Sequence, residues 1–252
     1  MRTPLIAANW KMHMTVPQGL RLVAEVKAAL RDLRGVEVVI CPPATALAAV
    51  AEALRGTTFV LGGQTMHWEP QGAFTGEISA AMLVDVGCRA VLIGHSERRL
   101  YFGESDEAVG RKVRSAFAGG LVPIVCVGER LEERQAGETD GVITRQVRAA
   151  VREMAAPDLP RLVVAYEPVW AIGTGQTATG AEAGRVAGVV RRVLAAGGAA
   201  AAAGEVRILY GGSVKPDNIR EFFEQPEIDG ALVGGASLDS QAFAAIVRAA
   251  TG

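Results

Sequence analysis

The chain has 252 residues, of which 50% are hydrophobic and only 5% are aromatic, so its core must be built mainly from Val, Leu, Ile and Ala. The net charge of −1, with no block of like charges, argues against nucleic acid as a partner. Three scattered cysteines match neither a disulfide framework nor a metal site. No apolar run approaches the about 18 residues of a membrane span, and the first apolar stretch, residues 5–8, is too short for a signal segment, so we expect a cytoplasmic protein without a membrane partner.

Eight short apolar runs recur along the chain, and each is followed by a stretch with helical spacing. The runs are continuous rather than alternating, which is typical of strands that are buried on both faces. They cover residues 5–8, 36–41, 58–61, 90–93, 122–127, 162–166, 206–210 and 231–233.

The first helical stretch illustrates the period of the intervening segments. Thr15 and Pro17 are a start signal, and the expected buried face comprises Leu20, Val23, Val26 and Leu30. Eight strands alternating with eight helices predict an α/β protein that forms a single-domain (β/α)8 TIM barrel over residues 1–252. An open, doubly wound sheet of eight strands has the same alternation and is the structural alternative.

Two segments break this alternation. Residues 62–76 have no period and carry the apolar side chains of Trp68 and Phe74, so we expect this loop to form an interface. The tract 195–204, composed of alanine and glycine, is predicted to be a frayed helix tail and a loop without chemistry.

The stretch AYEPVWAIGTGQT, residues 165–177, has the features of a lid with a base at its hinge. Pro168 holds Glu167 in an extended conformation at the tip of a strand. The apolar residues that follow can close over a ligand as one piece, and we place this lid at residues 168–178. An ordinary loop in which Trp170 fills a packing gap is the alternative.

Active sites of barrels lie at the carboxyl ends of the strands, so polar residues at those positions are the candidates. Lys11, beside Asn9, is interpreted as a fixed positive charge that faces a substrate oxygen. His95 precedes a helix start, where the helix dipole keeps its imidazole neutral. Glu97 is a candidate catalytic group or the partner of a structural ion pair, and Glu129 is at most a supporting residue.

Glycine pairs follow the seventh and eighth runs, at residues 211–212 and 234–235. Their backbone N–H groups can bind phosphate, and Ser213 adds a hydroxyl donor. Metal-ligand spacing, the dinucleotide fingerprint and the P-loop are all absent from the sequence, so no metal or cofactor is expected. A carboxylate, a neutral imidazole, a cation and a phosphate pocket suit proton removal next to a carbonyl.

Seven stretches in order resemble the triosephosphate isomerase family over essentially the whole chain. They are NWKM at 9–12, GAFTGEIS at 72–79, GHSERR with YFGESDE at 94–107, CVGE at 126–129, AYEPVWAIGTG at 165–175, YGGSVKPDN at 210–218 and GALVGGASL at 230–238. Departures at Thr65, Arg130 and Gln176 remove no catalytic group, although Gln176 replaces the lysine that many members carry at the lid hinge.

The resemblance implies interconversion of dihydroxyacetone phosphate and D-glyceraldehyde 3-phosphate. It implies Glu167 as the base, His95 as the neutral electrophile, and Asn9 and Lys11 at the substrate. The phosphate-binding residues that it implies are Gly173, Ser213, Gly234 and Gly235.

The family is typically a homodimer in which the loop at residues 62–76 enters the partner, which places Thr75 near residues 9–11. Two other functions are weighed against the isomerase. One is a barrel aldolase that uses Lys11 as a Schiff-base lysine, and the other is a non-catalytic protein that binds sugar phosphates.

Overall fold

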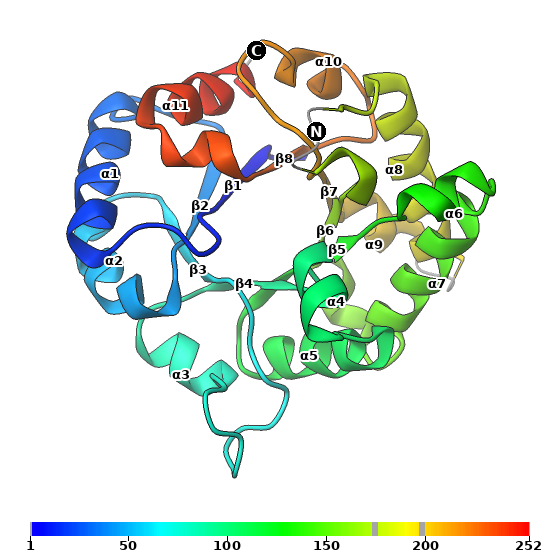
Figure 1. Ribbon diagram of the computed structural model, residues 1–252, viewed down its shortest axis with the longest axis horizontal. Coiled ribbons are helices and arrows are strands. Elements are labelled where there is room, and N and C mark those ends of the chain that lie inside the picture. Colours follow the sequence, from blue (N-terminus) through cyan, green and yellow to red (C-terminus); the bar gives the residue numbers. More distant parts are fainter. Residues whose placement is uncertain (1, 173–175, 197–199, 252) are drawn as a thin grey trace.

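A closed barrel of eight strands forms the centre of the molecule (Figure 1). The computed structural model describes residues 2–172, 176–196 and 200–251. The strands follow one another around the barrel in chain order, and β8 pairs in parallel with β1, which closes the sheet. This closure confirms the predicted (β/α)8 barrel and excludes the open sheet.

The strand positions agree closely with the apolar runs of the sequence. The strands are β1 (Leu5–Asn9), β2 (Glu37–Cys41), β3 (Val60–Gly63), β4 (Ala90–Ile93), β5 (Val122–Val127), β6 (Val163–Tyr166), β7 (Arg207–Tyr210) and β8 (Gly230–Val233). Only β3 differs from its prediction by more than one residue at an end. Gly62 and Gly63 pair with Ala90 and Val91 of β4, so the predicted loop begins two residues later than expected.

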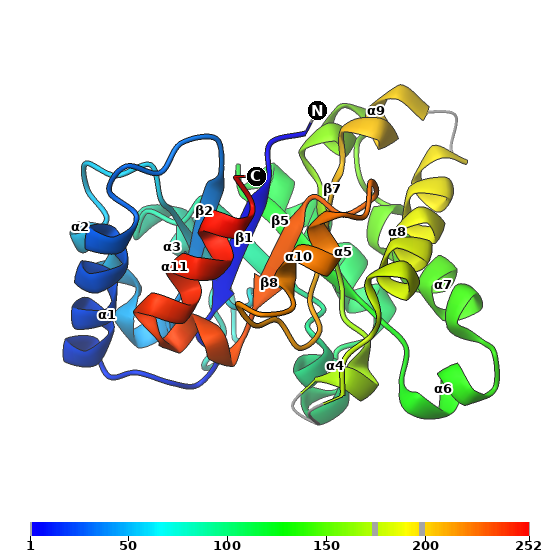
Figure 2. The same cartoon turned by 90° about the horizontal axis from the view of Figure 1, so that it is seen from above.

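Helices form an outer ring around the strands (Figures 1 and 2). The α-helices among the described residues are α1 (Val16–Ala29), α2 (Leu47–Ala53), α3 (Ala80–Asp85), α4 (Ser96–Phe102), α5 (Asp106–Ala118), α6 (Leu131–Gln135), α7 (Thr139–Val151), α8 (Gly180–Ala195), α9 (Ala200–Glu205), α10 (Ile219–Phe223) and α11 (Ser240–Ala249). Short 3-10 helices occupy η1 (Ala44–Ala46), η2 (Ala156–Arg161), η3 (Val169–Ala171) and η4 (Gly235–Leu238). Among the described residues, no helix is both long enough and apolar enough to cross a membrane.

Two details of the helix prediction are wrong. Leu20 is exposed, because the buried face of α1 is formed by Gly19, Leu22, Val23 and Val26. The tract 195–204 is not only a helix tail and a loop, because its second half belongs to α9, where Ala203 packs into the core. Alanine-rich sequence favours helix, and burial of this small side chain gives the short segment a packed face.

Two apolar layers share the strands, which explains the continuous apolar runs. Alternate residues such as Leu5 and Ala7 fill the inside of the barrel. Their neighbours Ile6 and Ala8 point outward and pack in the layer between strands and helices. Because both faces of each strand are buried, polar residues appear in the sequence only at the ends of the strands.

The three cysteines are free and buried. Burial raises the pKa of the Cys88 thiol to about 12, and it raises the pKa of Cys41 and of Cys126 well above the ordinary value. Since the thiolate is the reactive form, we expect a thiol reagent such as DTNB to label the native protein very slowly at about pH 8. Unfolding in guanidinium should expose all three thiols to rapid titration, and rapid labelling of the native protein would contradict this prediction.

Candidate active site

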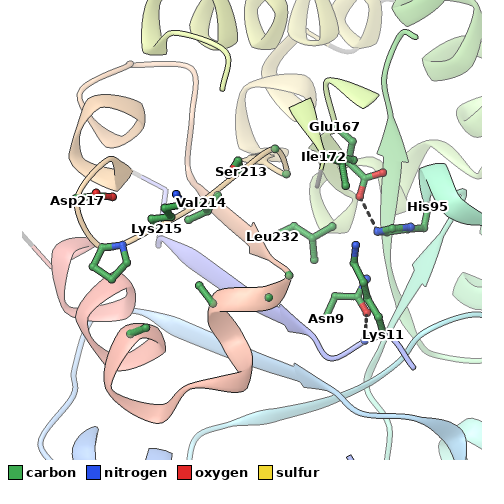
Figure 3. Close-up of a pocket in the computed structure, with 17 residues that line it drawn as sticks. Asn9, Lys11, His95, Glu167, Ile172, Ser213, Val214, Lys215, Asp217 and Leu232 are labelled. Atoms are coloured by element: carbon green, nitrogen blue, oxygen red, sulfur yellow. Dashed lines mark hydrogen bonds and ion pairs between the residues drawn. The ribbon is translucent and has the colours of Figure 1, made fainter. Parts of the chain in front are cut away.

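A cavity of about 710 Å³ opens at the carboxyl ends of the strands (Figure 3). Its wall brings together residues that follow β1, β4, β6, β7 and β8. Those predicted from the sequence are Asn9, Lys11, His95, Glu167, Ser213, Gly234 and Gly235. Glu97 does not line the cavity but contacts Lys11, whereas the predicted phosphate ligand Gly173 lies outside the described residues.

Glu167 directly follows β6 and is only 1% exposed. Its backbone N–H donates to Val127 O of β5 at 2.7 Å, which fixes the main chain at this strand tip. Its Oε2 accepts a hydrogen bond from Ser96 N at 2.9 Å, and its Oε1 lies 3.2 Å from His95 Nε2 (Figure 3). The carboxylate is therefore held at the cavity wall beside the imidazole.

His95 is the N-cap residue of α4, and this position orients its ring. Its Nδ1 accepts a hydrogen bond from Glu97 N at 3.2 Å. A nitrogen that accepts cannot carry the proton, so in the neutral ring the proton is on Nε2, which faces Glu167. The first turn of α4 thus selects the tautomer that presents an N–H donor to the cavity.

Lys11 adopts a backbone conformation that few side-chain-bearing residues adopt, with φ of 51°. Two hydrogen bonds hold it there: Lys11 N donates to Asn9 Oδ1 at 3.0 Å, and Gln64 Nε2 donates to Lys11 O at 2.8 Å. Its Nζ forms an ion pair with Glu97 Oε1 at 2.6 Å. Strained backbone of this kind persists where the surroundings over-determine it, and here it fixes an ammonium group at the cavity.

The loops after β7 and β8 form the other side of the cavity (Figure 3). Gly211, Gly212 and Ser213 follow β7, and Gly234 precedes η4, which begins at Gly235. Backbone N–H groups in such turns are the usual donors to phosphate in barrels. Gly211 lies against Glu167 and Gly234 lies against Lys11, so one small ligand bound between these loops, which we call the phosphate cradle, can contact all of these groups.

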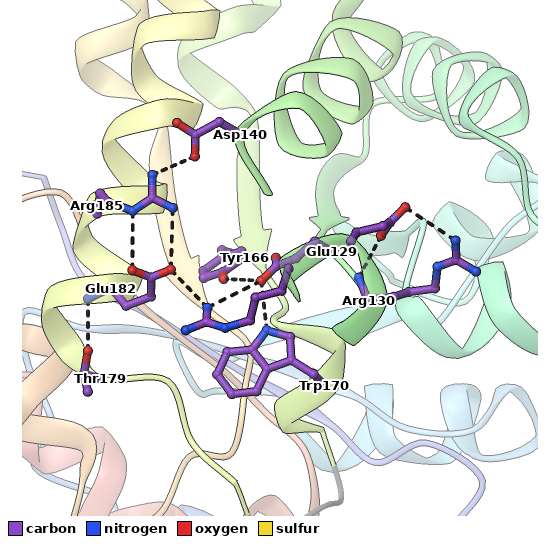
Figure 4. Close-up of polar contacts among 10 residues, drawn as sticks. Glu129, Arg130, Asp140, Tyr166, Trp170, Thr179, Glu182 and Arg185 are labelled. Atoms are coloured by element: carbon purple, nitrogen blue, oxygen red, sulfur yellow. Dashed lines mark hydrogen bonds and ion pairs between the residues drawn. The ribbon is translucent and has the colours of Figure 1, made fainter. Parts of the chain in front are cut away.

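Glu129 has a larger role in the structure than the sequence indicated (Figure 4). It is fully buried, and its Oε1 accepts hydrogen bonds from Tyr166 Oη at 3.2 Å and from Trp170 Nε1 at 2.8 Å. Burial raises the pKa of this carboxyl, and the hydrogen bond from Trp170 opposes that shift. The contact ties η3, the start of the predicted lid, to the tip of β5.

Arg134 of α6 extends this contact to the outer helices. Its guanidinium lies 4.3 Å from the centroid of the Trp170 ring, which is a cation–π distance. The same group donates to Glu182 Oε1 of α8 at 3.0 Å. Neither Arg134 nor Gln64 was singled out from the sequence, because a lone arginine or glutamine in an amphipathic segment resembles any solvated residue.

The arrangement supports acid–base chemistry on a small anion. A buried carboxylate, an imidazole N–H and an ammonium group meet at one wall, next to the backbone of the loops after β7 and β8. No cluster of three or more His, Cys, Asp or Glu side chains suited to a metal ion occurs in residues 2–172, 176–196 and 200–251. The side chains themselves can move a proton at a carbon next to a carbonyl and stabilise the negative charge that forms.

Comparison with known proteins agrees with this chemistry. Residues 4–250 match the family model described as triosephosphate isomerase. A relative named triosephosphate isomerase from Symbiobacterium thermophilum is 56% identical over 250 residues, which cover 99% of this chain and 98% of the relative. Relatives of the same name from Chloroflexus aurantiacus and Pelobacter propionicus are 55% and 53% identical over 248 residues, covering 98% of this chain and 99% of each relative. The chain belongs to the triosephosphate isomerase family.

Proposed function

We propose that this enzyme interconverts dihydroxyacetone phosphate and D-glyceraldehyde 3-phosphate in the cavity, through an enediol intermediate. The observation that carries the proposal is the buried Glu167 carboxylate, 3.2 Å from the Nε2 of a histidine whose other nitrogen accepts a backbone hydrogen bond. Membership of the isomerase family supports the reaction, and the names of the relatives give no support to the aldolase or the non-catalytic binding protein.

Each polar group at the wall has a distinct part in the proposed reaction. Glu167 removes the proton from the carbon next to the carbonyl. The Nε2–H of His95, now directed at Glu167, donates to the substrate oxygens and moves a proton between them. Lys11 and Asn9 stabilise the negative charge that develops on the enediolate. We assign Glu97 to positioning the Lys11 ammonium, because the two groups are 2.6 Å apart.

Phosphate binding and closure complete the proposed mechanism. Ser213, Gly234 and Gly235 donate to the phosphate, and Gly173 adds a donor from the lid when residues 168–178 close. Ile172 already lines the cavity, so a small movement of the segment brings an apolar side chain over the ligand. Exclusion of water protects the enediol phosphate from losing its phosphate group.

A direct assay tests the proposal. Glyceraldehyde 3-phosphate is added to the purified protein and the formation of dihydroxyacetone phosphate is followed, and we expect rapid conversion in both directions without added metal or cofactor. Folded protein without turnover would refute the proposal. Borohydride added during turnover should leave the mass of Lys11 unchanged, whereas a Schiff-base aldolase would gain covalent mass there.

A homodimer is also part of the proposal. The loop between β3 and α3 extends away from the barrel (Figure 1), and it carries exposed Phe74 and Thr75. Apolar side chains are exposed on α4 as well, where Tyr101 is 71% and Phe102 is 69% exposed. A second copy of the chain that covers these side chains would remove their apolar surface from water.

Replacing Thr75 with arginine is expected to convert the dimer into monomers at micromolar concentration, because the substitution buries an unpaired charge in the proposed interface. Sedimentation equilibrium measures the mass. We also expect kcat/KM to fall by about tenfold or more, because residues 9–11 would lose the contact with the partner that holds them in the geometry for reaction. Thr251→Arg, an exposed threonine near the end of the chain, is the matched control and should stay dimeric. Wild-type protein that is monomeric under these conditions would contradict the interface.

We further propose that the enzyme works in the cytoplasm. All three of its cysteines are free thiols, which fits a reducing compartment. Fractionation of the source cells, with the activity as the marker, tests this location.

A further inference from the structure

A buried glutamine of α7 is hydrogen-bonded to both backbone groups of Gly128, at the tip of β5. Gln146 Oε1 accepts from Gly128 N at 2.7 Å, and Gln146 Nε2 donates to Gly128 O at 3.1 Å. Gln146 is only 5% exposed. The last registered pair between β5 and β6 is Val127 with Tyr166, so Gly128 lies just beyond the strand ladder. The amide of Gln146 therefore acts at this position as a substitute for a neighbouring strand.

Gly128 packs directly against the backbone of Glu167. A methyl group at Gly128 would lie 1.7 Å from Glu167 O, far inside contact distance. Hydrogen bonds flank this contact on both sides, from Glu167 N to Val127 O at 2.7 Å and from Val169 N to Glu129 O at 3.1 Å. Any shift of Gly128 is therefore transmitted directly to the main chain of Glu167.

The opposite side of Glu167 is closed by β7. A methyl group at Gly211 would lie 2.9 Å from Glu167 Cγ, and Gly211 N donates to Tyr166 O at 2.7 Å. On this side the main chain itself holds the contact. On the β5 side two main-chain hydrogen bonds flank the contact, and the backbone groups of Gly128 itself are held by a side chain that reaches in from α7.

We propose that Gln146 is a positioning residue for the base: by fixing Gly128 it holds the Glu167 carboxylate at the orientation that proton transfer requires. The inference rests on the proposed function of Glu167. Its carboxylate points at His95 Nε2 and Ser96 N, and both contacts depend on where the main chain of Glu167 lies. Misplacement of a reacting group by about 1 Å lowers rates by about a hundredfold.

Gln146→Leu removes both hydrogen bonds and keeps a similar volume. We expect kcat to fall by about tenfold to a hundredfold while KM changes by about twofold or less, because Gln146 does not line the cavity and the phosphate cradle is untouched. Val147→Ala is the matched control, since Val147 is the next residue of α7, is buried, and has an apolar side chain that cannot hydrogen-bond to Gly128. It should lower the thermal midpoint and leave kcat unchanged.

Gln146→Glu supplies a readout that a purely structural role would not move. When protonated, the introduced carboxyl can accept from Gly128 N and donate to Gly128 O, as the amide does. When ionised, it can only accept and repels Gly128 O. Burial raises the pKa of a carboxyl, so the ratio of its kcat to that of the wild type should rise as the pH is lowered from about 8 to about 6.

The outcomes separate the inference from the proposed function. An inactive wild-type enzyme refutes the proposed function itself. An active wild type with unchanged kcat in Gln146→Leu, or with an equal loss in Val147→Ala, overturns the positioning role. If Gln146→Leu does not fold, the pH profile of Gln146→Glu decides: a rising ratio at low pH supports the role, and a flat ratio overturns it.

Discussion

Replacing Glu167 with glutamine is expected to lower kcat by about a thousandfold, which is the largest effect that we predict for a single side chain. The amide keeps the shape of the carboxyl and can still accept from Ser96 N, which the carboxylate contacts at 2.9 Å. It cannot take up a proton from carbon. The fold and the ligand contacts should therefore persist while the proton transfer is lost.

Three measurements separate this effect from damage to the protein. Turnover is measured in both directions, binding of a phosphorylated carboxylate analogue is measured by calorimetry, and the thermal midpoint reports on folding. Glu153→Gln, which changes a carboxyl on the surface that pairs with Arg114, serves as the matched control. Activity of the Glu167→Gln enzyme close to that of the wild type would remove Glu167 from the role of base.

Replacing Lys11 with methionine is expected to lower kcat/KM by about a hundredfold to a thousandfold, the range seen when one donor to a developing oxyanion is removed. Its ammonium is the cation that the structure fixes at the wall beside Asn9 and His95, through the ion pair with Glu97 at 2.6 Å. Methionine keeps the length of the chain and removes the charge. Both the attraction for the phosphorylated substrate and the stabilisation of the enediolate are then lost.

The ion pair makes a second arm of this experiment informative. In Lys11→Met the Glu97 carboxylate loses its partner, and its negative charge then faces an anionic substrate. Adding Glu97→Gln to Lys11→Met should therefore recover part of the loss. Lys215→Met is the matched control. Lys215 lies at the exposed rim of the same cavity, so this variant removes a positive charge near the site without removing the ion pair between Lys11 and Glu97. An equal loss from Lys215→Met would show that Lys11 acts only through the general field.

The contacts of the lid and of the base converge on the tip of β5. Glu129 receives Trp170 from the start of the lid, and its neighbour Gly128 supports the backbone of Glu167. Two adjacent residues thus contact the start of the proposed lid and the proposed base.

Local patterns in the sequence were sufficient to predict the barrel and the residues that gather at the wall of its cavity. Strands buried on both faces produce continuous apolar runs, and seven of the eight lie within one residue of the predicted ends. Once a barrel is predicted, chain geometry alone brings the ends of distant strands together, so Lys11, His95 and Glu167 could be grouped without any knowledge of their contacts. The position of β3 was predicted two residues too early, because Gly62 and Gly63 were assigned to the loop and glycine is uncommon within strands.

Only the tertiary structure decided which side chains hold that wall in place. Gln64 supports Lys11 from 53 positions away, and Gln146 supports Gly128 from 18 positions away. Each is a single amide whose role depends on the distance between packed elements, and no period or spacing along the chain encodes that distance. The sequence alone therefore determined the fold and the side chains that gather at the cavity, whereas the closed barrel decided which side-chain amides contact the backbone that carries them.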